Sequence, residues 1–184
     1  AFEHYLEARI FDLYDDPMPS RTDLEGYLGE TAAAIVQFAA LVLEPEAAPA
    51  FAAAAGHAGC AQGIAGIVRL LPIHRARGQC YVPAEMLTAA GTDRDAFVSG
   101  GNPAAARRAV EAMVALGREH LARFEAEAKG LPPTLRPAFL PAALAGRYLD
   151  RAASPGFDPV TEVTDISTLK RHWTLLRAAM RGWE

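Results

Sequence analysis

The spacing of apolar residues is helical along almost the whole chain. Apolar side chains recur every three or four residues, which places them on one face of an α-helix. No strand-like alternation of apolar and polar residues lasts for more than four residues. Helices are therefore predicted at residues 2–14, 22–44, 47–71, 84–90, 93–98, 103–129, 136–152 and 165–182. The predicted fold class is all-α.

Three of these helices carry clear apolar stripes. The first has Phe2, Leu6, Ile10 and Leu13 on one face. The last has Ile166, Leu169, Trp173, Leu176 and Met180 on one face. The helix at 103–129 carries the stripe that we expect to be buried, formed by Val110, Met113, Val114, Gly117, Leu121 and Phe124. The second helix opens with Thr22 and Glu25, which have the spacing of a capping box.

The predicted helix at 47–71 consists largely of Ala and Gly. Each glycine would weaken an isolated helix by about 1 kcal/mol relative to Ala. Their use must therefore lie in packing, because small residues let a neighbouring backbone approach closely. A glycine-rich face of this kind suits another helix or a flat apolar ligand. Pro72 is expected to end the helix, and the segment from Arg75 to Pro83 is expected to form a loop.

Composition and charge narrow the range of functions. The 184 residues suit one domain spanning 1–184, with an ordinary globular composition. The net charge of −4 provides no general basic field, so we predict no nucleic-acid partner. Cys60 and Cys80 have no CxxC spacing, and we expect both to be small core residues in a reducing compartment.

No uninterrupted apolar run reaches the roughly 18 residues of a membrane span, and no secretory signal is recognisable. The predicted location is the cytoplasm of a bacterial-type cell, with at most peripheral contact to the inner membrane. The chain begins with Ala and enters directly in a helical pattern. We therefore expect it to be a fragment.

Two groups of residues suggest chemistry. Asp12, Asp15 and Asp16 lie within five residues and could hold Mg²⁺ and, through it, a diphosphate. Solvated acidic residues at a helix end are the commoner explanation of such a cluster. No two of the histidines His4, His57, His74, His120 and His172 have the spacing of a zinc site.

The second group is the stretch from Gly56 to Pro83. Its Arg69, Arg75 and Arg77 could bind phosphate oxygens. The alternative is a tightly packed core helix that leads into a solvated basic loop. Residue types alone favour the core helix.

This stretch resembles the second aspartate-rich motif of the squalene/phytoene synthase family. In that family a small-residue helix leads into N-x-x-R-D-x-x-x-D and then R-x-G-R-x-Y-x-P. The residues that match in register are Arg69, Arg77, Gly78, Tyr81 and Pro83. The resemblance covers residues 1–98 well and the later helices loosely. It implies an isoprenoid synthase-like helical bundle that lacks the family's N-terminal helices, about the C-terminal two thirds of the fold.

The departures from the family motif concern the metal. Leu70 and His74 stand where the family has its two metal-binding aspartates, and Gly66 replaces the Asn. The first aspartate-rich motif is absent, and the cluster around Asp12 does not align with it. Mg²⁺ prefers hard oxygen ligands, which Leu cannot supply. We therefore predict no cofactor, no metal ligand and no catalytic residue.

One divergent branch of the family shows the same losses. It is the branch that resembles the mitochondrial complex I assembly factor, and its G-I-x-x-x-L-R-x-x-P-x-H pattern is similar to the stretch GIAGIVRLLPIH here. The matching residues are Gly63, Ile64, Arg69, Pro72 and His74, then Pro137, Ala138, Phe139 and Leu140, and Trp183. This resemblance implies a non-catalytic role, either in respiratory complex I assembly with a protein partner or in binding an apolar isoprenoid or lipid-like ligand.

Two other functions stay open. One is a prenyltransferase of the squalene/phytoene synthase type that condenses isoprenoid diphosphates with Mg²⁺, and the other is a helical domain that only packs against a partner. By equivalence to the family cavity, the ligand-binding candidates are Tyr27, Gln62, Arg69, His74, Arg77 and Tyr81. We expect an apolar chamber between the helices at 22–44, 47–71 and 103–129.

Overall fold

The computed structural model describes residues 2–14 and 16–183, and most of them are helical. None of the described residues lies in a strand, so the all-α prediction is confirmed. The α-helices are α1 (Phe2–Arg9), α2 (Arg21–Leu28), α3 (Ala34–Leu43), α4 (Ala52–Arg69), α5 (Leu71–Ala76), α6 (Ala84–Ala89), α7 (Arg94–Ser99), α8 (Pro103–Glu127), α9 (Arg136–Phe139), α10 (Ala145–Ala152) and α11 (Thr168–Arg181). Short 3₁₀ turns occupy Ile10–Leu13, Ala48–Phe51 and Leu140–Leu144, and a π-helical turn occupies Gly29–Ala33.

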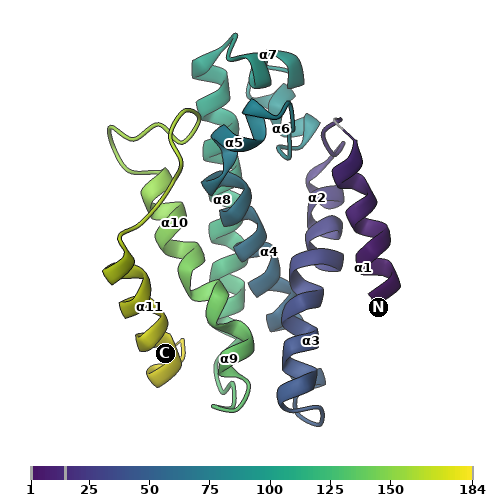
Figure 1. Cartoon of the computed structure of the whole chain (residues 1–184), viewed down its shortest axis with the longest axis vertical. Helices are drawn as coiled ribbons and strands as arrows, with labels where there is room; N and C mark the ends of the chain where they lie inside the picture. Colours follow the sequence, from purple (N-terminus) through teal and green to yellow (C-terminus); the bar gives the residue numbers. More distant parts are fainter. Residues whose placement is uncertain (1, 15, 184) are drawn as a thin grey trace.

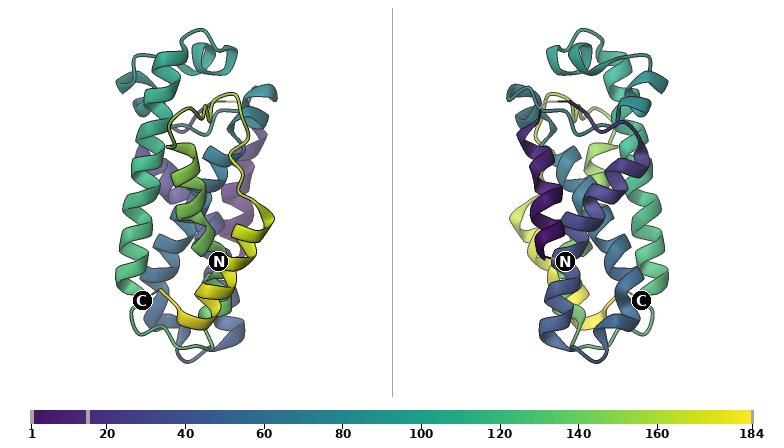
Figure 2. Two further views of the ribbon diagram at one scale, coloured as in Figure 1. Left: turned by 90° about the vertical axis from the view of Figure 1, so that its left-hand side faces the viewer. Right: turned by 90° about the vertical axis from the view of Figure 1, so that its right-hand side faces the viewer.

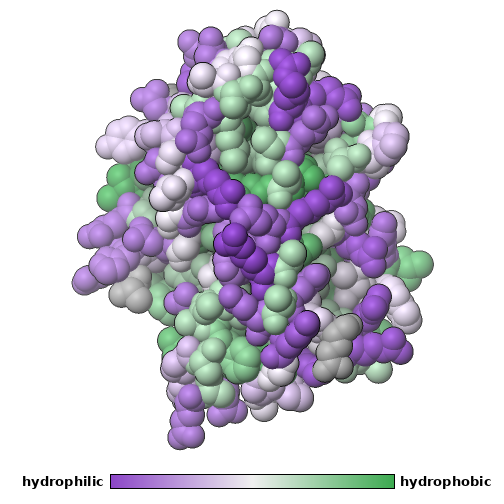
Figure 3. All heavy atoms as spheres, turned by 180° about the vertical axis from the view of Figure 1, so that it is seen from behind, coloured by the Kyte–Doolittle hydropathy of each residue, from purple (hydrophilic) through white to green (hydrophobic). Residues whose placement is uncertain are grey.

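Helices α4 and α8 form the centre of the bundle (Figure 1). Helix α8 runs behind α4, with α2 and α3 on one side and α10 on the other. Helix α1 forms one outer edge and α11 the opposite edge, while α5, α6 and α7 close one end (Figures 1 and 2). The back of the molecule, behind α8, mixes polar and apolar side chains (Figure 3).

The contact between α4 and α8 is a solid core. Ile64 and Val68 of α4 are buried together with Val110 and Met113 of α8. The stripe predicted on the helix at 103–129 is therefore confirmed, except that Leu121 is only partly buried. The predicted chamber does not lie there. The cavity on this side of the bundle is lined by α1, α2, the π-helical turn, α3, α4 and α5, and α8 contributes nothing to it.

Helix α4 and the α2–α3 segment approach closely at one glycine. A Cβ built on Gly59 would overlap both the Cα and the backbone nitrogen of Ala33. Ala33 ends the π-helical turn, so a widened turn of one helix meets a residue without a side chain on the other. The prediction that glycines in this helix serve close packing is confirmed at Gly59.

Two local predictions about helix ends are wrong. The capping box of α2 is formed by Ser20 and Asp23, because the Ser20 hydroxyl accepts from the Asp23 backbone N–H and the Asp23 carboxylate accepts from the Ser20 N–H. Pro72 does not end a helix that runs to residue 71. Helix α4 ends at Arg69, and Pro72 lies in the first turn of α5, where its missing N–H costs nothing.

A polar chain crosses the bundle and links α2, α4 and α8. His120 of α8 is buried, and its Nε2 lies 2.9 Å from Oε1 of Glu25 on α2. Its Nδ1 lies 3.0 Å from Nδ1 of His57 on α4. The Nε of Arg21 donates to the same Glu25 oxygen at 2.8 Å. Burial raises the pKa of Glu25, but the bonds from Arg21 and His120 outweigh it and hold the pKa below its ordinary value.

An aromatic cluster fixes the C-terminus to the bundle. The Trp183 ring meets the Phe124 ring edge-on at 5.0 Å and the Phe139 ring at 6.3 Å. Phe124 and Phe139 are themselves stacked, with ring centroids 5.8 Å apart. The sequence singled out Phe139 and Trp183 through a family resemblance, and both serve the packing of α8 against α9.

Two helical runs are long and apolar enough by composition to cross a membrane, namely Arg21–Leu43 and Ala48–Arg69. The sequence pattern predicted no span, because charged or polar residues interrupt both runs. Core helices of water-soluble bundles pass the same test of length and mean hydropathy. Since the second run contains the central helix α4, we treat both as helices of the bundle.

Candidate functional site: a cavity beside the central helix

An open cavity of about 370 Å³ lies between α1, α2, the π-helical turn, α3, α4 and α5. Its lining consists of Tyr5, Arg9, Tyr27, Leu28, Thr31, Ala32, Ile35, Gly63, Gly66, Ile67, Leu70, His74 and Tyr81. Glycines of α4 create part of the space. A Cβ on Gly66 would have no neighbour within 4 Å, whereas a Cβ on Gly63 would lie 2.5 Å from a methyl of Leu28.

Asp12 organises the polar end of this cavity. The Tyr27 hydroxyl donates to Asp12 Oδ1 at 2.8 Å, and the Tyr81 hydroxyl donates to the same oxygen at 3.0 Å. The Arg9 guanidinium forms an ion pair with Asp12 Oδ2 at 3.0 Å and donates to the Tyr27 oxygen. The N-terminal segment is therefore tied to α2 and to the segment after α5 through one carboxylate.

Both phenols at this end stay protonated at neutral pH. Burial raises the pKa of Tyr27, and the bond to the Asp12 carboxylate raises it further. Burial and the charge of Asp12 raise the pKa of Tyr81 to about 12. A deprotonated phenol could not donate to the carboxylate and would repel it. The two tyrosines are therefore fixed as neutral hydrogen-bonding groups at the wall of the cavity.

Replacing Asp12 by Asn should lower the pKa of Tyr81 toward the ordinary tyrosine value, because the negative charge disappears while burial remains. Absorbance of tyrosinate during an alkaline titration measures this shift, and Tyr81→Phe in both backgrounds assigns it. Asp16→Asn is the matched control, since Asp16 is exposed. Equal titration curves for Asp12→Asn and the parent would contradict the hydrogen-bonded arrangement.

His74 lies at the same wall, with its ring centroid 4.9 Å from that of Tyr81. Burial lowers the pKa of His74, and the charge of Arg77 lowers it further, so the imidazole is neutral at pH 7. Its Nδ1 is buried and has no hydrogen-bond partner among the described residues. A buried nitrogen without a hydrogen-bond partner lowers the stability of the folded state.

The residues around the cavity do not fit a metal–diphosphate site. Gly66, Leu70 and His74 stand in the register of the family's Asn and two aspartates, and all three line the cavity. None of them supplies the oxygen ligands that Mg²⁺ requires. Within residues 2–14 and 16–183, no group of three or more His, Cys, Asp and Glu side chains could hold a metal ion.

Three of the six candidate ligand-binding residues face the cavity, namely Tyr27, His74 and Tyr81. The other three are not among its lining residues. The Arg69 guanidinium lies over the Tyr148 ring, 5.0 Å from its centroid, and 3.7 Å from Asp165.

Gln62 is half-buried on α4, and Arg77 is exposed after α5. Arg75 was also a candidate for binding phosphate. In the structure its guanidinium instead donates hydrogen bonds to the backbone carbonyls of Phe97, Val98 and Val160. Arg75 thus serves to join three backbone segments.

Sequence reasoning missed Arg9 and underrated Asp12. Asp12 was noted only as part of an acidic cluster, in which Asp16 is exposed and Asp15 lies outside the described residues. Its partner Tyr81 is 69 positions away in the chain. No spacing rule connects residues so distant, and only the fold brings them together.

Comparisons with known proteins agree with this architecture. A sequence model of the squalene/phytoene synthase family matches residues 1–177. Among solved structures, squalene synthase HpnC from Alicyclobacillus acidocaldarius is similar with a TM-score of 0.69 and 18% sequence identity, over 82% of this chain and 57% of that chain. At that identity the likeness concerns the fold, and it confirms the predicted isoprenoid synthase-like bundle.

Among curated proteins, the chain is similar to NADH dehydrogenase (ubiquinone) complex I, assembly factor 6, of Mus musculus. The identity is 26% over 153 residues, which is 83% of this chain and 46% of the mouse protein. The chain therefore spans about half the length of this relative. The divergent branch suggested by the sequence is supported by this similarity.

Proposed function

Because the chain belongs to the squalene/phytoene synthase family, we propose that it uses the family's fold to bind an apolar isoprenoid or lipid-like ligand without metal-dependent prenyl transfer. One observation carries the proposal. The three positions where the family motif has Asn, Asp and Asp point into the cavity here as Gly66, Leu70 and His74. A cavity lies at this register, and the residues that would bind the metal are replaced.

The cavity suits a ligand with an uncharged polar head. The one cationic side chain among its described lining residues is Arg9, and that guanidinium is already paired with Asp12. A diphosphate would therefore enter without compensating charge, which is costly in a partly buried site. The oxygens of Tyr27 and Tyr81 give their protons to Asp12, and they can instead accept a hydrogen bond from the hydroxyl of an alcohol.

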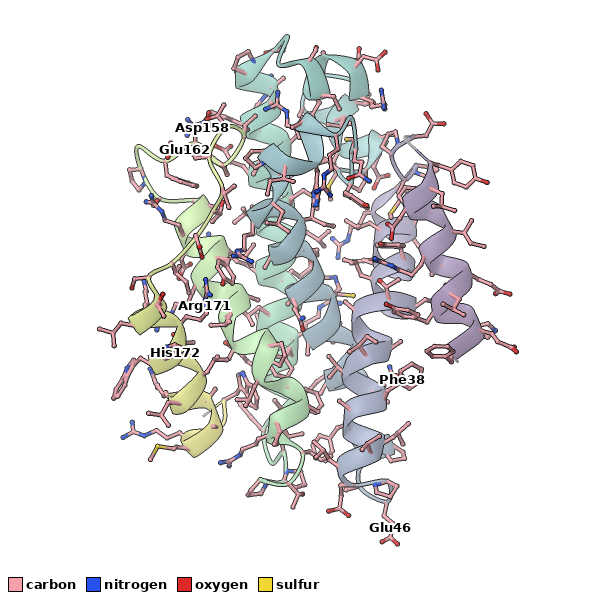
Figure 4. The ribbon with its side chains drawn as sticks, in the orientation of Figure 1. Phe38, Glu46, Asp158, Glu162, Arg171 and His172 are labelled. Atoms are coloured by element: carbon pink, nitrogen blue, oxygen red, sulfur yellow. The ribbon has the colours of Figure 1, made fainter. Side chains whose placement is uncertain are left out.

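The cavity also offers apolar contacts to the body of such a ligand. Leu28, Ile35, Ile67 and Leu70 line the cavity beyond its polar end. A second, more open apolar groove is lined by Ile35, Phe38, Ala39, Val42, Leu43, Pro137 and Ala138. Ile35 belongs to both, and Phe38 extends from α3 below the end of α1 (Figure 4). A long isoprenoid tail can leave the cavity along this groove.

We further propose a role of the complex I assembly type, with a protein partner, from the similarity to the mouse assembly factor. This role would place the chain in the cytoplasm of a bacterial-type cell, in peripheral contact with the inner membrane. The cavity ligand is the part of the proposal that the geometry supports in detail, so the test is directed at it.

Replacing Gly66 by Leu should weaken binding of a neutral isoprenoid alcohol at least tenfold. The new side chain has open space at its Cβ and would fill the cavity without disturbing the core. The probes are farnesol and geranylgeraniol, and binding is measured by calorimetry and by the rise in Tm, which follows ligand affinity. Gly56→Leu is the matched control, because Gly56 is on the same helix, has no neighbour within 4 Å of its Cβ and lies outside the cavity.

The same assay decides between binding protein and prenyltransferase. Geranylgeranyl diphosphate with Mg²⁺ should raise Tm no more than without Mg²⁺, and no diphosphate should be released. A Mg²⁺-dependent rise in Tm together with diphosphate release would replace our proposal by the transferase. Failure of both alcohols to bind the parent chain would also overturn it.

A further inference from the structure

Helix α11 lies on the outer edge of the bundle, against α9 and the 3₁₀ turn that follows it (Figures 1 and 2). Of its 14 residues, Ala178 alone is classed as buried. The helix therefore contributes little to the core, although its sequence has the amphipathic pattern of a core helix.

The apolar stripe of α11 faces outward. Leu169 is 80% exposed, Trp173 65%, Leu176 51% and Met180 71%. Their spacing of four, three and four residues places them in one line along the helix. A water-soluble surface seldom exposes four large apolar side chains in a continuous row, and such a row indicates an interaction site.

The charged residues of α11 itself are all positive. Residues 168–181 contain Lys170, Arg171, Arg177 and Arg181 and no Asp or Glu, in a chain whose net charge is −4. Arg171 turns toward α10 and forms an ion pair with Asp165 at 2.8 Å (Figure 4). The side chains of the other three have no ion pair or hydrogen bond to any described residue.

We propose that α11 is a membrane-docking helix that lies in the interface of an anionic bilayer. Leu169, Trp173, Leu176 and Met180 would enter the boundary between headgroups and acyl chains. The three unpaired cations lie along one flank of this row and would bind lipid phosphates there. An anionic bilayer has an apolar layer that matches the exposed apolar row and a dense negative charge that matches the cations.

The other outward apolar faces lack this charge pattern. Helix α3 exposes Leu41, Val42 and Leu43, but Glu44 and Glu46 follow directly, and Glu46 lies at the tip of the bundle (Figure 4). Helix α1 (Phe2–Arg9) contains two glutamates and one arginine. Negative charge beside those faces opposes an anionic surface, so charge complementarity selects α11.

Vesicle flotation of the full chain tests the proposal. Vesicles of phosphatidylcholine alone should retain little protein, and vesicles with about one third phosphatidylglycerol should retain most of it at low salt. Replacing Lys170, Arg177 and Arg181 by Glu should weaken retention at least about tenfold, because each cation near the surface contributes separately. Leu169→Ser, Trp173→Ser and Leu176→Ser together should have the same effect.

The matched control changes the apolar face of α3. The variant Leu41→Ser/Val42→Ser/Leu43→Ser removes as many exposed apolar side chains and should leave retention unchanged. Equal retention on both kinds of vesicle, or loss of retention in the α3 variant alone, would overturn the proposal. So would a dimer that dissociates when the stripe is replaced and that binds no vesicles, because a second copy would then cover the stripe.

Tryptophan fluorescence reports the contact directly. In a Trp183→Phe background Trp173 is the remaining tryptophan, and its emission should shift to the blue and be quenched by brominated acyl chains. This readout does not depend on the cavity. Failure of alcohol binding with intact flotation would refute the proposed ligand, and the reverse result would refute the docking helix.

Discussion

Replacing Gly59 by Ala is expected to lower the free energy of unfolding by about 1–3 kcal/mol, the usual cost of overpacking a close contact. The added methyl would overlap the Cα of Ala33. A side chain could relieve such an overlap by changing its rotamer, but a backbone atom cannot. Chemical denaturation monitored by circular dichroism measures the change. For a chain of this size, each kcal/mol corresponds to about 2–4 °C in Tm.

Gly56→Ala is the control for this variant and should have the opposite sign. Gly56 lies on the same helix, and a Cβ there meets nothing within 4 Å. Ala is preferred to Gly in a helix by about 0.5–1 kcal/mol, so stability should rise by that amount. If Gly59→Ala were as stabilising as Gly56→Ala, α4 and the π-helical turn could not be as close as the structure has them.

Replacing His120 by Ala should cost about 1–3 kcal/mol, because it removes a buried side chain and leaves two partly buried polar groups with fewer partners. His57 would lose its only ring-nitrogen partner at hydrogen-bond distance among the described residues, and Glu25 would keep only Arg21. Three helices meet at His120, so the loss should appear as a single cooperative transition at lower denaturant concentration.

His172→Ala is the matched control, since His172 is exposed on α11 (Figure 4). Its effect should stay within about 0.5 kcal/mol, as for other surface substitutions. Equal effects of the two replacements would show that the hydrogen-bonded side chains of Arg21, Glu25, His120 and His57 contribute nothing to stability.

The residues of the family motif have two different roles in the structure, packing and lining the cavity. Arg69 matches the family, yet its guanidinium packs over Tyr148, and its carbonyl accepts a hydrogen bond from the backbone of Thr164. These contacts attach the segment before α11 to the central helix. Gly66 and Leu70, which depart from the family, face the cavity. The matching arginine thus has a structural role here, while the replaced positions are those that would have met the metal.

The sequence by itself determined the helices and the family. Apolar spacing located the helices at 84–89 and 103–127 to within two residues, because hydrophobic periodicity is a local property. The register of Arg69 and Tyr81 identified the fold, and the same register shows that Leu70 and His74 replace the family's aspartates. The helix breaks were harder to predict, since the π-helical turn and the turn of α5 at Pro72 depend on what packs against them.

The tertiary structure decided how the site is built and which faces are free. Asp12 meets Tyr27 and Tyr81 only because the N-terminal segment packs against the π-helical turn that follows α2, a long-range contact that no local pattern encodes. The stripe of α11 has the same periodicity as the buried stripe of α8. Periodicity therefore does not predict whether the apolar face of a helix packs against its neighbours or is exposed. Packing alone buries Met113 and leaves Trp173 in solvent.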